Sequence, residues 1–151
     1  GGNDKSKDTS DTMKQVSRLF NPVSKEHIYT ADAHEIDVLI NQKHWGNDEG
    51  VKWTGANENS PTRDFPVYRV YNPDTGEHLF TQDHNEVSVL TSSYGWNDEG
   101  TCWYSSTTKN IPVYRLYNPY SGEHLFTADA NEAGTLVSYG WNNEGVRWYG
   151  L

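Results

Sequence analysis

The feature that most constrains this chain is an internal repeat, in which three similar segments follow one another. They cover residues 16–55, 67–105 and 113–150 and align almost without gaps. Polar connectors that end in proline, ANENSPTRDFP and STTKNIP, separate them. One such segment cannot bury an apolar face by itself, so we expect the three to pack around one shared core.

Each segment carries the same order of local signals. An opening run such as VYRLY predicts a strand that stops at Asn-Pro and a tight turn, and the EHLFT that follows predicts the second strand of a hairpin. An Asp-x-x-Glu pair then predicts a capped helix start. This pair recurs as Asp32/Glu35, Asp83/Glu86 and Asp129/Glu132. The helix is expected to end at a glycine such as Gly95 or Gly140, before a final strand.

These signals predict a β-rich α+β fold. We expect three β-β-α-β repeats closed into a single pseudo-threefold, trefoil-like domain over residues 16–151. An open row of three units is the alternative, although it would leave sheet edges exposed. Trp53, Trp103 and Trp148 hold the same place in each final strand and are expected to be core residues. Residues 1–15 are polar, and we expect a flexible linker with a Gly-Gly cleavage remnant, in a fragment of a larger protein.

Composition narrows the function classes. The formal net charge is -9 at pH 7, which disfavours nucleic acid and anionic lipid because both are bound mainly through Lys and Arg. No apolar run is long enough to span a bilayer, so no membrane insertion is expected. Cys102 is the only cysteine, which excludes an intrachain disulfide and a cysteine-based metal site. Strand alternation predicts that it faces solvent.

The loops WNDEG and WNNEG place a ring, an amide and a carboxylate within a few residues, which suits sugar recognition. Matched Tyr, Arg and His residues accompany them. The candidate ligand-binding residues are Trp96, Asn97, Glu99, Trp141, Asn142, Glu144, Tyr71, Tyr117, Arg69, Arg115, His78 and His124. The first segment departs from the pattern at Lys25 and has an extra residue before Glu49, so we expect its site to be degraded.

A structural role for the same residues stays open, as core rings, turn-forming amides and part-buried histidines hydrogen-bonded to a neighbouring Glu or a backbone carbonyl. Three histidines meeting on an axis could bind zinc, but nothing in the sequence shows that His27, His78 and His124 converge. The spacing of a calcium loop is absent. We therefore predict no catalytic residue, no metal and no cofactor.

The strings YRLYNPYSGEHLFTAD and YGWNNEGVRWYG resemble the tandem repeat of a domain-of-unknown-function family with the consensus Y-R-L-Y-N-P-x-S-G-x-H-[FL]-[YF]-T followed by G-W-x-x-E-G. The resemblance covers residues 16–151. It implies an accessory domain of secreted bacterial and fungal proteins, covalently linked to cell-wall hydrolases, glycosidases or proteases. A secreted or cell-surface location follows from it, and the family brings no established catalytic residues.

Nearly every polar candidate is present in triplicate, whereas catalysis requires one asymmetric set of residues. Triplication favours multivalent binding. We therefore expect a non-catalytic carbohydrate- or cell-wall-binding module that targets a larger protein to a glycan or a peptidoglycan-associated polysaccharide. A protein-interaction or adhesion module that uses exposed Tyr and Trp residues is the alternative, and a hydrolase is the least favoured reading.

Overall fold

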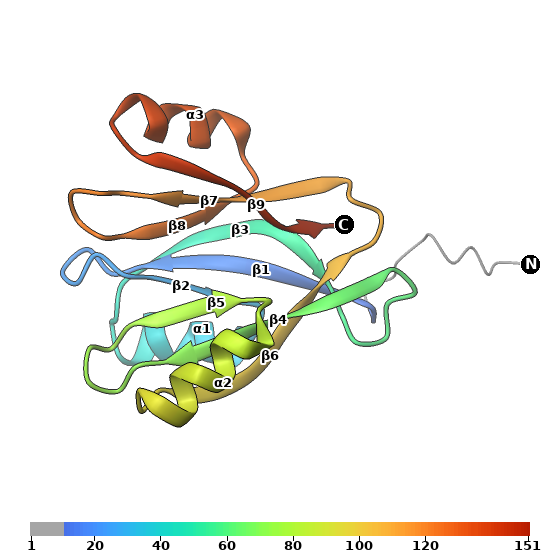
Figure 1. Ribbon diagram of the computed structural model, residues 1–151, viewed down its shortest axis with the longest axis horizontal. Coiled ribbons are helices and arrows are strands. Elements are labelled where there is room, and N and C mark those ends of the chain that lie inside the picture. The colour runs from blue at the N-terminus through green and yellow to red at the C-terminus, as the bar shows by residue number, and fades with distance from the viewer. Residues whose placement is uncertain (1–10) are drawn as a thin grey trace, which may run out of the picture.

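A computed structural model describes residues 11–151 as strands and short helices in three successive segments (Figure 1). The first contains β1 (Met13–Phe20), β2 (His27–Thr30), α1 (Ala33–Asp37), a π-helical turn η1 (Val38–Gln42) and β3 (Asn47–Ala56). The second contains β4 (Arg63–Tyr71), β5 (His78–Thr81), α2 (His84–Ser93) and β6 (Asn97–Ser106). The third contains β7 (Ile111–Tyr117), β8 (His124–Thr127), α3 (Ala130–Ser138) and β9 (Asn142–Gly150).

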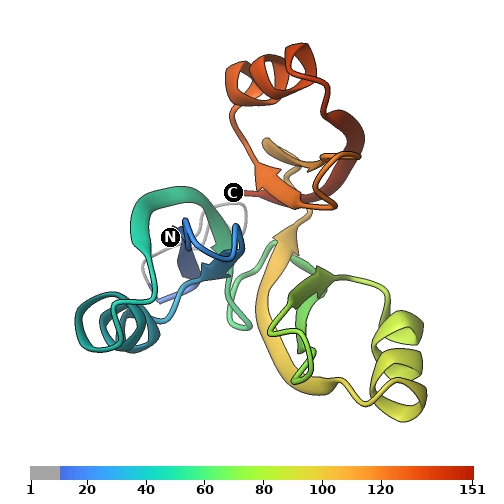
Figure 2. The same cartoon turned by 90° about the vertical axis from the view of Figure 1, so that its left-hand side faces the viewer.

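The strands form two antiparallel sheets, one of six strands in the order β2-β1-β3-β6-β4-β5 and one of three in the order β8-β7-β9. Viewed from the hairpin end, the three segments lie around a common centre with their helices at the outer rim (Figure 2). Their hydrogen bonding is nevertheless unequal. The fold is a β-sandwich with three short helices, and the prediction of three equal β-β-α-β repeats closed into a trefoil-like domain is wrong.

The unequal pairing arises at the ends of the last strands, where the matched residues differ. β3 joins β6 through the pair Ala56 and Tyr104. Gly55 permits this approach, because a Cβ at that position would lie 2.9 Å from Cδ1 of Trp103. β9 meets its neighbours through single hydrogen bonds instead, in which Tyr149 N donates to Ser105 Oγ and Leu151 N donates to Thr54 O. Although the three segments are similar in sequence, they therefore do not form the same strand pairs with one another.

Local signals in the sequence are confirmed. Asp32, Asp83 and Asp129 each cap a helix, accepting hydrogen bonds from two backbone N–H groups of its first turn. The hairpin turns place Gly76 and Gly122 at φ of +79° and +78°, the left-handed region that glycine tolerates. Lys25 adopts φ of +65° at the matched position of the first turn, so that turn keeps its geometry at a cost in backbone strain.

Aromatic rings fill the core between the two sheets. Trp53, Trp103 and Trp148 are 4%, 1% and 3% exposed, which confirms their predicted burial. Their ring centroids lie 5.7 to 6.1 Å apart, so each touches the other two. Tyr29 crosses between the sheets, and its hydroxyl accepts a 2.7 Å hydrogen bond from Phe126 N. A core of this kind fixes how the three segments sit relative to one another.

All three hairpin turns lie at one end of the molecule, on the left in Figure 1, whereas β1 begins and β9 ends toward the other. The first ten residues of the predicted linker lie outside the described residues, and Met13, Lys14 and Gln15 pair with β3. Within residues 11–151, no helix is both long and apolar enough to cross a membrane.

Candidate functional site

The three hairpin turns enclose a polar hollow of about 310 Å³. Each turn contributes a glutamate and the histidine that opens the following strand. These residues are Glu26, Glu77, Glu123, His27, His78 and His124. The wall also includes the hydroxyl groups of Ser24, Thr75 and Ser121, together with Lys25 and Gly122. Nothing in the spacing of the histidines showed that they converge, yet the fold places all three around one cavity.

A smaller recess of about 80 Å³ continues the hollow toward the core. The two cavities share the three histidines and Glu77, which therefore form the neck between them. Rings of Tyr29, Phe80 and Phe126 line the recess. Arg115 is the only Arg or Lys among the residues that line it. The site is thus polar at its mouth and aromatic at its base.

Each histidine of the neck packs on an aromatic ring of the preceding strand. The ring centroids of His27 and Phe20 lie 4.7 Å apart, and matched pairs form between His78 and Tyr71 and between His124 and Tyr117. Burial, followed by the charge of Arg18, lowers the pKa of His27 to about 4. Burial and a neighbouring arginine also lower the pKa of His78 and of His124. All three imidazoles are therefore neutral at pH 7.

A hydrogen bond to a neighbouring glutamate, one of the two kinds of partner predicted for the histidines, is not formed at His78 or His124. Nε2 of His78 lies 3.6 Å from Oε1 of Glu99, and Nε2 of His124 lies 3.8 Å from Oε1 of Glu144. Both distances exceed a normal hydrogen bond. Among the described residues, the buried Nδ1 atoms of His27 and His78 have no hydrogen-bond partner. Within the same residues, no group of three His, Cys, Asp or Glu side chains is arranged to hold a metal ion.

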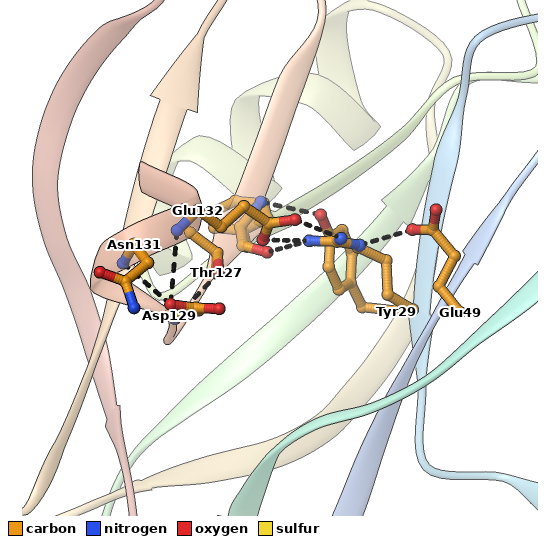
Figure 3. Close-up of polar contacts among 8 residues, drawn as sticks. Tyr29, Glu49, Thr127, Asp129, Asn131 and Glu132 are labelled. Carbon is orange, nitrogen blue, oxygen red and sulfur yellow. Dashed lines mark hydrogen bonds and ion pairs between the residues drawn. The ribbon is translucent and has the colours of Figure 1, made fainter. Parts of the chain in front are cut away.

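Arginines of the first strands tie the segments together. Nε of Arg18 contacts Glu49 of its own segment at 2.7 Å, while its two terminal nitrogens bind both oxygens of Glu132, on α3, at 2.9 and 2.8 Å. Glu49 and Glu132 approach the guanidinium group that binds them both from opposite sides (Figure 3). The hydrogen bond from Arg18 lowers the pKa of Glu132 to about 2.

Arg69 repeats this arrangement, with Nε on Glu99 at 2.8 Å and the terminal nitrogens on Glu35 at 2.9 and 2.8 Å. Glu35 and Glu132, in the first turns of their helices, therefore bind an arginine of a neighbouring segment instead of the backbone at the start of their own helix. The carboxylate of Glu49 contacts the arginine of its own segment at 2.7 Å, as Glu99 and Glu144 do, although an extra residue precedes it.

Arg115 departs from the other two arginines. Its Nε contacts Glu144 at 2.7 Å, but its terminal nitrogens have no partner among the described residues. Glu86, the counterpart of Glu35 and Glu132, is exposed and contacts no cation within residues 11–151. The exposed fraction of the side chain rises from 5% for Arg18 to 15% for Arg69 and 24% for Arg115. One of the three junctions is thus open.

The predicted site residues form two matched clusters. Asn97 and Asn142 are exposed and pair across the sheet with Tyr71 and Tyr117, and the arginine, histidine and glutamate of each cluster lie beside them. Trp96 and Trp141 precede the last strands and are half-buried. Because Glu99 and Glu144 are already paired with arginines, these carboxylates have a structural task that the sequence did not reveal.

Sequence comparison of the segments missed Tyr120. It is 87% exposed on the β7–β8 turn, and a Cβ added at Gly140 would meet its Cε2 at 3.2 Å, so the ring lies beside the end of α3. The matched positions hold Val23 and Asp74, and a search for residues present in every segment passes over it.

The expectation that Cys102 faces solvent is wrong. It is half-buried against the core rings, because it lies where the first and second segments meet, beside Tyr29 and Arg69. Burial raises the pKa of its thiol to about 12, so the reactive thiolate is scarce at neutral pH.

A family model described as Domain of unknown function (DUF5648) matches residues 15–151. The chain belongs to this family. No match was found among curated proteins or among solved structures. The family description assigns no activity, so the function has to be argued from the geometry of the hollow.

Glu35→Gln is expected to lower the free energy of unfolding by about 1 to 2 kcal/mol, because it removes one partner of a partly buried bidentate ion pair. Glu86→Gln, the matched substitution at the open junction, should change it by less than about 0.5 kcal/mol. Urea denaturation followed by circular dichroism measures both. Equal losses in the two variants would contradict the difference between the junctions.

Proposed function

We propose that this domain is a non-catalytic glycan-binding module and that the hollow between the hairpin turns is its binding site. The observation that carries the proposal is the convergence of three turns on one hollow of about 310 Å³. This volume is at the lower end of the range of about 300 to 1,000 Å³ typical of small-ligand sites. The three turns favour one shared site over three separate ones.

The chemistry of the wall suits sugar hydroxyl groups. Glu77 and Glu123 can accept hydrogen bonds from them, while Thr75 and Ser121 can donate as well as accept. The neutral imidazoles of the neck offer both functions too. The exposed ring of Tyr120 precedes Ser121 on the β7–β8 turn, but it lies beside the end of α3 and does not line the hollow, so the polar wall carries the proposal.

Two features support binding without catalysis. The carboxylates nearest the neck histidines, Glu99 and Glu144, are each held by an arginine, which disfavours proton transfer by these groups. The neck itself repeats the same residue type three times, whereas catalysis requires different residues in different roles. The family resemblance adds the proposal that the domain acts outside the cell, where it targets a linked hydrolase to a polysaccharide.

Retention on insoluble peptidoglycan, chitin and cellulose, together with a glycan array, tests the proposal. Glu123→Gln should weaken binding about threefold to tenfold, because it removes a charged acceptor from the wall of the hollow. Glu58→Gln is the charge-matched control, since Glu58 is exposed and does not line the hollow.

Two results would count against the proposal. Retention of no glycan, with capture of a defined protein instead, would favour the adhesion module. Equal losses for Glu123→Gln and Glu58→Gln would show that binding does not use the hollow.

A further inference from the structure

Arg18 and Arg69, the arginines of the first strands in the first and second segments, make the same set of contacts. In each, Nε binds a glutamate of the same segment, and the terminal nitrogens hold both oxygens of a second carboxylate. Parallel bonds from a planar guanidinium to both oxygens of a carboxylate are among the strongest hydrogen-bonded contacts in proteins. The second carboxylate is therefore a regular part of the arrangement.

At Arg115 the first half of this arrangement is complete and the second half is missing. Nε binds Glu144 at 2.7 Å, as in the other junctions, so the guanidinium is held in a defined orientation. Its terminal nitrogens contact no carboxylate within residues 11–151. A guanidinium that is held in this orientation, with both terminal nitrogens free to donate, can bind a carboxylate from outside the chain.

Arg115 is reachable from the proposed glycan site. Arg115 lines the small recess, and the recess meets the hollow at His78 and His124. His124 is the most exposed of the three neck histidines, with 41% of its side chain exposed against 13% for His78. A ligand group that enters between these histidines would approach Arg115 directly.

The charges of the hollow restrict the ligand further. Glu26, Glu77 and Glu123 line the mouth against one lysine, Lys25, and burial together with the charge of Glu77 raises the pKa of Glu26. A polyanion would be repelled there, because like charges a short distance apart destabilise one another. A largely neutral glycan with one acidic sugar at its end avoids this repulsion.

We propose that the terminal nitrogens of Arg115 bind the carboxylate of a terminal acidic sugar, in the place that Glu132 takes on Arg18 and Glu35 on Arg69. This inference rests on the proposed glycan function and names its ligand class, a neutral glycan chain that ends in a uronic acid. The sugar ring would occupy the hollow while its carboxylate reaches into the recess.

Isothermal titration with two trisaccharides tests the inference. Both have the same two neutral sugars, and one ends in glucuronic acid where the other ends in glucose. The acidic trisaccharide should bind at least about tenfold more tightly. Arg115→Gln should abolish this preference, and Arg115→Lys should lose most of it, because lysine keeps the charge but cannot form the paired contact. Lys43→Gln, at an exposed lysine on the first segment, is the charge-matched control and should keep the preference.

Three outcomes would overturn one proposal or the other. Equal binding of both trisaccharides, unchanged by Arg115→Gln, overturns the acidic ligand and leaves the glycan module standing. Binding of sodium acetate as tight as that of the acidic trisaccharide, and lost in Arg115→Gln, overturns the glycan module and leaves the carboxylate site standing. A loss of thermal stability in Glu86→Gln equal to that in Glu35→Gln would show that Glu86 already occupies Arg115, which overturns the vacant site.

Discussion

Trp103→Ala is expected to lower the free energy of unfolding by about 3 to 5 kcal/mol. Trp103 is 1% exposed, and its ring contacts Trp53, Trp148 and Phe80 at centroid distances of 5.7, 5.8 and 5.9 Å. These partners come from all three segments, so the cavity left by the substitution would weaken every junction at once. Urea denaturation monitored by circular dichroism measures the change.

Two variants keep this prediction specific. Phe65→Ala removes a large ring that is 70% exposed and should change stability by less than about 0.5 kcal/mol. Trp103→Phe should cost much less than Trp103→Ala, because it fills most of the space and removes an indole N–H that has no hydrogen-bond partner among the described residues. A small loss for Trp103→Ala, similar to that of Phe65→Ala, would contradict the assignment of this ring to the shared core.

Much of the local structure could be predicted because it depends on neighbours in the sequence. The capping aspartates, the turn glycines and the buried position of Trp103 all follow from spacing within one segment. The sheet arrangement could not be predicted in the same way. It depends on contacts between segments, such as Gly55 against Trp103 and Tyr149 N with Ser105 Oγ, at positions where the segments differ.

The candidate site shows the same division. Matching the segments found the arginines, histidines and glutamates, but it could not show that Glu35 and Glu132 leave their own helices to bind arginines of other segments. It also treated Arg115 as equivalent to Arg69, whereas only the fold reveals that one junction is open. Residues found in a single segment, such as Tyr120, were passed over because triplication was the criterion.

Acidification from about pH 7 to about pH 4.5 is expected to lower the free energy of unfolding, and His27 alone should account for about 2 to 3 kcal/mol of the loss. Burial and the positive charge of Arg18 lower the pKa of His27 from 6.5 to about 4. Between these values the unfolded chain binds a proton that the folded chain does not, so stability falls as the pH falls.

Other titrating groups act in known directions within this interval. His78 and His124, whose pKa values are also lowered, add to the loss. Glu26 opposes it, because its raised pKa favours proton uptake by the folded chain. Glu132, with a pKa of about 2, loses its contribution only as the pH falls below 4.5. The net result in this interval is destabilisation, because three histidines act against one carboxyl group.

His27→Gln separates the contribution of this residue from the rest. Urea denaturation at a series of pH values should show a shallower decline in the variant, whereas His44→Gln, which removes an exposed histidine, should decline as the unchanged chain does. The ring of His27 also packs on Phe20, so His27→Gln is expected to be somewhat less stable at every pH. A direct titration of the His27 ring by NMR in the unchanged chain avoids that difficulty. A midpoint near 6.5 in the folded protein would refute the explanation, since His27 would then bind its proton equally in both states.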